Sequence, residues 1–259
     1  TRFFPAPLGP EDMMAAIEKY KITSLYTAPT MYRLLADLAD RYDISSLEKC
    51  VSAGETLPKA TWEAFHKATG IRIVDGLGST EMIHIFVTAS REDMGPGFTG
   101  KAIPGYRAKI VDEDGNELGP NQPGLLTVQG PTGCRYLADD RQRTYVKDGW
   151  NYPGDMYEMD EDGYFKYVAR ADDMIISAGY NISGPEVENA LLDHPAVGEC
   201  AVIGKPDEKR TSIVKAFVVL RDGFGPGDEM TKTLQDFVKN EIAPYKYPRK
   251  VVFVAELAK

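Results

Sequence analysis

The stretch ARADDMIISAGYNISGPEVE, residues 169–188, marks the point where the pattern of the chain changes. Before it, short extended runs alternate with glycine and proline turns, which is typical of β-structure. After it, helical patterns alternate with apolar strands, which is typical of a compact α+β unit. The charged residues Arg170, Asp172 and Asp173 fall on this change. We therefore expect a solvated junction between two structural units here.

The first part of the chain, residues 1–94, predicts a sheet with parallel connections. Apolar residues recur at helical spacing over 10–21, 31–40 and 58–70, and the intervening extended runs cover 22–28, 47–55 and 71–78. An alternation of strand and helix requires crossover connections, which place neighbouring strands parallel to one another. This part is therefore expected to be α/β.

The later parts predict two further units. Residues 95–170 are rich in glycine and in turn signals such as DEDG at 160–163, which favours a small antiparallel, barrel-like unit. Residues 171–259 combine predicted helices over 185–194 and 230–242 with predicted strands over 198–204, 212–220 and 250–255. The whole chain is thus expected to be α/β, ending in a small α+β unit.

Composition excludes several classes of function. The 259 residues contain 30 basic and 39 acidic side chains, and this charge of -9 gives no general attraction for nucleic acid or anionic membranes. Apolar stretches such as AFVVL at 216–220 are too short to span a bilayer. The three cysteines, Cys50, Cys134 and Cys200, lack metal-ligand spacing, and we expect buried free thiols in a cytoplasmic protein.

Two glycine turns are the strongest candidates for a ligand site. SAGE (52–55) and DGLGSTE (75–81) each follow a predicted strand, and ligands of parallel sheets bind at the carboxyl ends of strands. The hydroxyl of Thr80 and the carboxylate of Glu81 could contact a phosphate and its magnesium ion. Taken singly, each motif favours an ordinary tight turn over a ligand site.

Other candidate residues are scattered along the chain. Asp155 in YPGD (152–155) could accept hydrogen bonds from ribose hydroxyls, and Arg170 could neutralise phosphate, although both also fit a solvated surface. His84 follows the second glycine turn among apolar residues, where it is either a pocket residue or a core residue. The spacing of a hydrolase triad or of a zinc site is absent from the sequence.

The order of these motifs carries more information than any one of them. SAGE, GSTE, YPGD and ARADD, followed by AGYNISGPEVE, resemble the signature motifs of the adenylate-forming superfamily over essentially the whole chain. The sequence is most similar to acyl- and aryl-CoA ligases, especially benzoate- and 2-aminobenzoate-CoA ligases, whose glycine turn also reads DG-x-GSTEM before a histidine. The resemblance implies the latter part of a large adenylating domain, followed by a small mobile C-terminal domain.

The resemblance also implies an activity. Such enzymes use ATP and Mg²⁺ to convert a carboxylic acid into an acyl adenylate, and coenzyme A then displaces AMP. Two alternatives remain open at this point. The first is an adenylation module that loads a carrier protein, and the second is a non-catalytic remnant that binds nucleotide or serves as a structural module.

The resemblance also implies a role for each candidate residue. Ser52, Ala53, Gly54, Glu55, Asp75, Gly76 and Leu77 would surround the nucleotide base, and Thr80 would contact phosphate. Glu81 would hold Mg²⁺, and Asp155 with Arg170 would lie at the ribose. Gly78, Met82, His84 and Ile85 would border the acyl pocket, and Gly179 would lie at the pantetheine arm of coenzyme A. Asp172 would be the hinge of the small domain.

The sequence also departs from the family pattern. Pro153 replaces the usual threonine before Gly-Asp, and Ala169 replaces a glycine. The phosphate-gripping loop with its lysine and the C-terminal catalytic lysine are not among these residues. We therefore expect an incomplete fragment with little activity alone and with a tendency to associate, for example as a homo-oligomer.

Overall fold

The computed structural model describes residues 8–90, 93, 95–207 and 209–257. By their internal contacts the residues form two compact units. The N-terminal unit comprises Thr1–Pro153 and Tyr157–Tyr167, and the C-terminal unit comprises Gly154–Met156 and Val168–Lys259. The division into 1–94, 95–170 and 171–259 stays a prediction.

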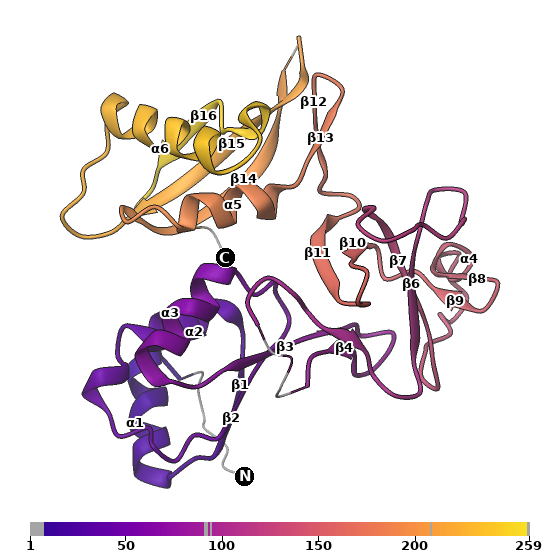
Figure 1. Ribbon diagram of the computed structural model, residues 1–259, viewed down its shortest axis with the longest axis horizontal. Helices are drawn as coiled ribbons and strands as arrows, with labels where there is room; N and C mark the ends of the chain where they lie inside the picture. The colour runs from indigo at the N-terminus through magenta and orange to yellow at the C-terminus, as the bar shows by residue number, and fades with distance from the viewer. Residues whose placement is uncertain (1–7, 91–92, 94, 208, 258–259) are drawn as a thin grey trace. The chain divides into compact units, whose positions relative to one another are not determined.

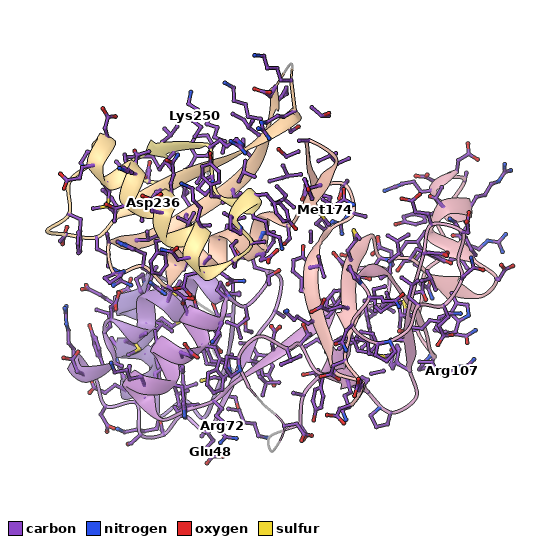
Figure 2. All side chains as sticks on the ribbon, turned by 45° about the horizontal axis from the view of Figure 1, so that its top comes forward. Glu48, Arg72, Arg107, Met174, Asp236 and Lys250 are labelled. Atoms are coloured by element: carbon purple, nitrogen blue, oxygen red, sulfur yellow. The ribbon has the colours of Figure 1, made fainter. Side chains whose placement is uncertain are left out.

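The N-terminal unit begins with a parallel sheet, as the sequence predicts. Strands β1 (Ser24–Thr27), β2 (Lys49–Ser52) and β3 (Ile73–Gly78) are neighbours in that order and run parallel. Glu48 and Arg72, the residues before β2 and β3, lie at the same edge of the sheet (Figure 2). The opposite edge therefore carries the residues that follow the strands.

Three helices bury the apolar residues of this sheet. They are α1 (Pro10–Tyr20), α2 (Pro29–Ala36) and α3 (Lys59–Thr69). Tyr32 and Phe65, from α2 and α3, are buried and pack edge to face with ring centroids 5.0 Å apart. The helix expected over 31–40 ends earlier than predicted, at Ala36. Beyond that residue the amides of Leu38 and Arg41 donate to carbonyls three residues back, which is the tighter 3₁₀ pattern.

Two short antiparallel strands extend the sheet. β4 (Ile85–Thr88) pairs with β3, and β5 (Lys101–Ala102) pairs with β4. Gly78 permits the close approach of β3 and β4, because a Cβ at that position would lie 2.7 Å from the carbonyl oxygen of His84. The end of the DGLGSTE motif, residues 79–81, therefore lies in the connection between two paired strands.

The remainder of the N-terminal unit is mainly antiparallel. Its strands are β6 (Arg107–Val111), β7 (Gly124–Gln129), β8 (Val146–Lys147), β9 (Trp150–Asn151), β10 (Asp155–Met159) and β11 (Phe165–Arg170), in the order β11-β10-β7-β9-β8 with β6 beside β7. The start of β10 and the end of β11 belong to the C-terminal unit. These described pairings form a branched sheet (Figure 1). The short helix α4 (Arg141–Tyr145) is a correction to the antiparallel, barrel-like unit expected over 95–170, which included no helix. RQRTY has too few apolar residues to show a helical period.

The C-terminal unit has an α+β fold. Its sheet contains β12 (Ile175–Ser177), β13 (Tyr180–Ile182), β14 (Val197–Asp207), β15 (Thr211–Leu220) and β16 (Lys250–Phe253), with β16 parallel to β15. Helices α5 (Gly184–Leu192) and α6 (Asp228–Glu241) contact each other, and α5 packs on β14 (Figure 1). Asp236 and Lys250 mark α6 and β16 in Figure 2. Buried Leu191, Val218 and Leu234 join these layers in one core.

Ser183 connects strand β11 to helix α5. Its Oγ accepts a hydrogen bond from the amide of Glu186 at 3.1 Å, as an N-cap does, and donates one to the carbonyl of Val168. Replacing Ser183 by alanine should lower the free energy of unfolding by about 1 to 2 kcal/mol, because both bonds are lost. Urea unfolding of the Ser183→Ala variant measures this cost, and a stability equal to that of the wild type would contradict it.

The sequence predicts three buried free thiols, and the burial part of this prediction is correct for one cysteine and wrong for two. Cys50 is wholly buried, whereas Cys134 and Cys200 are half-buried. All three are free thiols. Within the described ranges, no helix is both long enough and apolar enough to cross a bilayer.

Candidate functional site

The ends of the parallel strands bring two predicted residues side by side. Ser52 at the end of β2 is the register partner of Asp75 on β3. The buried Oγ of Ser52 has no hydrogen-bond partner among the described residues. Burial raises the pKa of the Asp75 carboxyl from its ordinary value of 3.8 to about 7, against the lowering effect of hydrogen bonds from Gly76 and Thr99. Polar groups with incomplete solvation at a strand end are typical of a ligand site.

The first glycine turn projects into solvent. Ala53, Gly54 and Glu55 are all exposed, and Gly54 has a φ of 93°, which favours glycine. The carboxylate of Glu55 accepts a hydrogen bond from the hydroxyl of Thr30 at 2.8 Å. The turn is therefore anchored to the start of α2 while its backbone stays accessible.

The second glycine turn is held by backbone bonds. The amide of Met82 lies 3.2 Å from both the carbonyl oxygen and the Oγ of Ser79, and the amide of Ile83 donates to the carbonyl of Thr80 at 3.2 Å. These bonds leave Thr80 exposed and Glu81 half-buried. Gly76 and Leu77 precede the turn within β3. The turn thus presents a hydroxyl and a carboxylate from one rigid segment.

Glu81 has a partner that is distant in the sequence. The hydroxyl of Tyr136 donates to its Oε1 at 2.6 Å, and this bond lowers the pKa of the Glu81 carboxyl. No three carboxylate, histidine or cysteine side chains form a metal-binding group in the described part of the chain. A Mg²⁺ ion at Glu81 would accordingly take most of its oxygen ligands from phosphate and water, which suits this cation.

The four residues predicted for the acyl pocket lie in different environments. Met82 is fully buried in a hydrophobic cluster with Phe86, and Ile85 is half-buried. Gly78 is exposed. His84 is exposed too, so its interpretation as a core residue is wrong; its Nδ1 lies 3.3 Å from the carbonyl oxygen of Ile85.

Ile83 is a residue that the sequence analysis missed. Its side chain is 76% exposed and its φ is 71°, a backbone conformation that is strained for a β-branched residue. Strain of this kind concentrates at ligand sites. The sequence signal for Ile83 was its place as a β-branched residue directly after GSTEM (78–82).

The C-terminal unit contains a second group of predicted residues. The Asp155 carboxylate, whose side chain is 14% exposed, lies 3.3 Å from Nη1 of Arg170. Nε of the same arginine lies 3.4 Å from Oδ1 of the exposed Asp172. Burial raises the pKa of Asp155 although Arg170 lowers it. The result is a poorly solvated acceptor group, oriented by an arginine, at the start of β10.

Gly179 lies in the tight turn between β12 and β13. Its φ is 84°, and a Cβ there would meet no atom within 4 Å. The next residue, Tyr180, is 53% exposed and stacks on Tyr245 with centroids 4.4 Å apart. The turn therefore has open space at the Cβ position of Gly179, and contact with the pantetheine arm stays a prediction.

The raised pKa of Asp75 predicts a pH-dependent stability. A carboxyl with a folded pKa of about 7 and an ordinary value of 3.8 binds its proton more tightly when folded. This group should therefore make the free energy of unfolding fall between pH 4 and pH 7, with no further change above that range. Asp75→Asn should flatten the fall in a series of urea unfolding curves. Identical pH profiles for variant and wild type would contradict the assignment.

Comparison with known proteins extends the interpretation of these residues. Residues 2–136 match the model of the AMP-binding enzyme family, and residues 186–259 match the model of the AMP-binding enzyme C-terminal domain. The chain is 41% identical over 255 residues to the uncharacterized acyl-CoA ligase YtcI of Bacillus subtilis (strain 168), covering 96% of this chain and 48% of that protein. It is 42% identical to the mitochondrial acyl-coenzyme A synthetase ACSM3 of Homo sapiens, covering 96% of this chain and 44% of the synthetase.

A solved structure shares the fold. The crystal structure of the anthranilate CoA ligase AuaEII in complex with anthranoyl-AMP superposes with a TM-score of 0.90 at 39% identity, over 96% of this chain and 49% of that one. The chain thus spans about half the length of the relatives it matches. Because one family model matches residues 2–136, more than half of the chain, the chain belongs to the AMP-binding enzyme family.

Proposed function

We propose that the protein containing this chain is an ATP-dependent acid-thiol ligase that forms a coenzyme A thioester. The observation that carries the proposal is the half-buried Asp155 carboxylate, held by Arg170 at 3.3 Å and able to accept hydrogen bonds from ribose hydroxyls. Relatives named as acyl-CoA ligase and acyl-coenzyme A synthetase support it.

The proposed reaction has two steps. A substrate carboxylate attacks the α-phosphate of ATP, forming acyl-AMP and releasing pyrophosphate. The thiol of coenzyme A then attacks the acyl carbon, and AMP leaves with the electron pair of the broken anhydride bond. Both steps need charge neutralisation at phosphorus and exclusion of water from the anhydride.

The residues of this chain have distinct roles in the proposal. Thr80 contacts phosphate, and Glu81 holds Mg²⁺ through one carboxylate while phosphate and water supply the other ligands. Ser52, Ala53, Gly54, Glu55, Asp75, Gly76 and Leu77 border the base, and Gly78, Met82, His84 and Ile85 border the acyl group. Asp172 is the hinge, and Gly179 lies at the pantetheine arm.

We further propose an aromatic acid of the benzoate type as substrate. The support is the DGLGSTEM sequence followed by His84, together with the likeness to a ligase that was crystallised with anthranoyl-AMP. The exposed strained Ile83 would then be an apolar contact for the ring.

The free thiols are consistent with a cytoplasmic location, which also stays part of the proposal.

A product assay tests the acceptor and the acid together. The protein is incubated with ATP, Mg²⁺ and either benzoate, 2-aminobenzoate or hexanoate, with free coenzyme A or a phosphopantetheinyl carrier protein. Mass spectrometry should detect the aromatic coenzyme A thioesters in greatest yield. A product on the carrier protein alone would instead support the carrier-loading alternative.

A further inference from the structure

Tyr136 connects the second glycine turn to a segment 55 residues further along the chain. Its hydroxyl lies 2.6 Å from Oε1 of Glu81, which is a short hydrogen bond to a charged acceptor. A bond of this kind restricts the rotamers of the carboxylate, which would otherwise rotate about three side-chain torsions. Tyr136 therefore selects one orientation of Glu81.

Three contacts fix the position of Tyr136 itself. Its amide donates to Oε1 of Gln142 at 2.8 Å, and its ring packs edge to face on buried Tyr145 with centroids 5.8 Å apart. The guanidinium of Arg141 lies 4.5 Å from the ring centroid, and Nη2 of Arg141 forms an ion pair with Asp139 at 2.7 Å. All of these partners lie in or beside α4. The helix thus supports the phenol, and the phenol supports the carboxylate.

The other side of the turn is fixed by different means. The side chain of Met82, next to Glu81, is fully buried, and its amide bonds Ser79. The backbone at Glu81 is therefore immobilised by burial and the side chain by Tyr136. A preorganised carboxylate of this kind binds a cation with less loss of conformational freedom.

We propose that Tyr136 is a positioning residue that holds Glu81 in the orientation required to bind the magnesium ion of a nucleotide. The proposal rests on the proposed function for the identity of the cation. The proposal also gives helix α4 a function, since none of the nucleotide-related motifs includes its residues. Outer-shell partners of metal ligands contribute about tenfold or more to metal affinity.

The test compares Tyr136→Phe with Tyr106→Phe. The matched control removes a phenol hydroxyl from the same unit, where it bonds the hydroxyl of Thr132 at 2.5 Å. Two measurements are made on each variant at one fixed neutral pH. The first is the ¹³C resonance of the Glu81 carboxyl carbon, identified by its absence in Glu81→Gln. The second is a pair of calorimetric affinities, one for ATP with Mg²⁺ and one for AMP without metal.

Tyr136→Phe should move the Glu81 resonance and weaken binding of Mg²⁺-ATP by about tenfold, with metal-free AMP affinity within about twofold of the wild type. Tyr106→Phe should change neither quantity. An unmoved resonance, or equal losses of Mg²⁺-ATP and AMP affinity, would overturn the positioning role. Failure of the wild type to bind either nucleotide contradicts the proposed function instead, and the resonance then decides whether Tyr136 holds Glu81.

Discussion

Asp155→Asn is expected to weaken AMP binding by about 10- to 100-fold. Hydrogen bonds to a charged acceptor contribute about 1.5 to 3 kcal/mol, and each 1.4 kcal/mol corresponds to a tenfold change in affinity. The carboxylate is only 14% exposed and its pKa is raised by burial, so it gains more from ligand hydroxyls than a solvated carboxylate would. Isothermal titration calorimetry with AMP measures the change.

Glu158→Gln provides the matched control for Asp155. Glu158 lies on the same strand, β10, and forms an ion pair with Lys166 of β11 at 2.9 Å. The substitution therefore removes one charge and one cross-strand pair without touching the ribose acceptor. AMP affinity should stay within about twofold of the wild type, because surface ion pairs contribute little. Equal losses in both variants would show that Asp155 acts only through the fold.

Phe65→Ala is expected to cost about 3 to 5 kcal/mol of the free energy of unfolding. Phe65 is 1% exposed, lies on α3, and packs edge to face on buried Tyr32. The hydroxyl of Tyr32 lies 3.0 Å from the carbonyl oxygens of Leu25 in β1 and Val51 in β2. Loss of the ring therefore leaves a cavity beneath the strands that carry Ser52 and Asp75. Chemical denaturation of the purified chain gives the cost.

Phe98→Ala is the control for that substitution. Phe98 belongs to the same unit, is 44% exposed and contacts the ring of Tyr164 at a centroid distance of 6.1 Å. Its removal should cost no more than about 1 kcal/mol, since it opens no cavity in a core. A similar cost for both variants would contradict the core position of Phe65.

The fold is predictable from the sequence wherever one periodicity extends over several turns. Helix α3 begins and ends within one residue of the expected 58–70, because proline precedes it and Gly70 follows it. Helix α4 and strand β4 were not predicted. The first has too few apolar residues for a period, and the second depends on a pairing with β3 that only the close approach at Gly78 permits.

The candidate site is predictable to a smaller extent. The order of the motifs indicates which glycine turns belong to a ligand site. Their positions after strands of a parallel sheet indicate that these turns lie at the same edge of the sheet. The environment of each side chain is a tertiary property, so the exposure of His84 and the burial of Met82 differ although both follow the same turn. The contact between Tyr136 and Glu81 has no sequence signal, since it depends on how a segment 55 residues further along the chain folds back onto the turn after β3.

Acid-dependent exchange of labelled pyrophosphate into ATP tests the central claim most directly, because it reports acyl-adenylate formation without coenzyme A. The protein containing this chain is assayed with Mg²⁺ and a panel of benzoates and fatty acids. We predict exchange that depends on a benzoate-type acid and falls strongly in the Asp155→Asn variant. No stimulation of exchange by any acid of the panel would contradict the account.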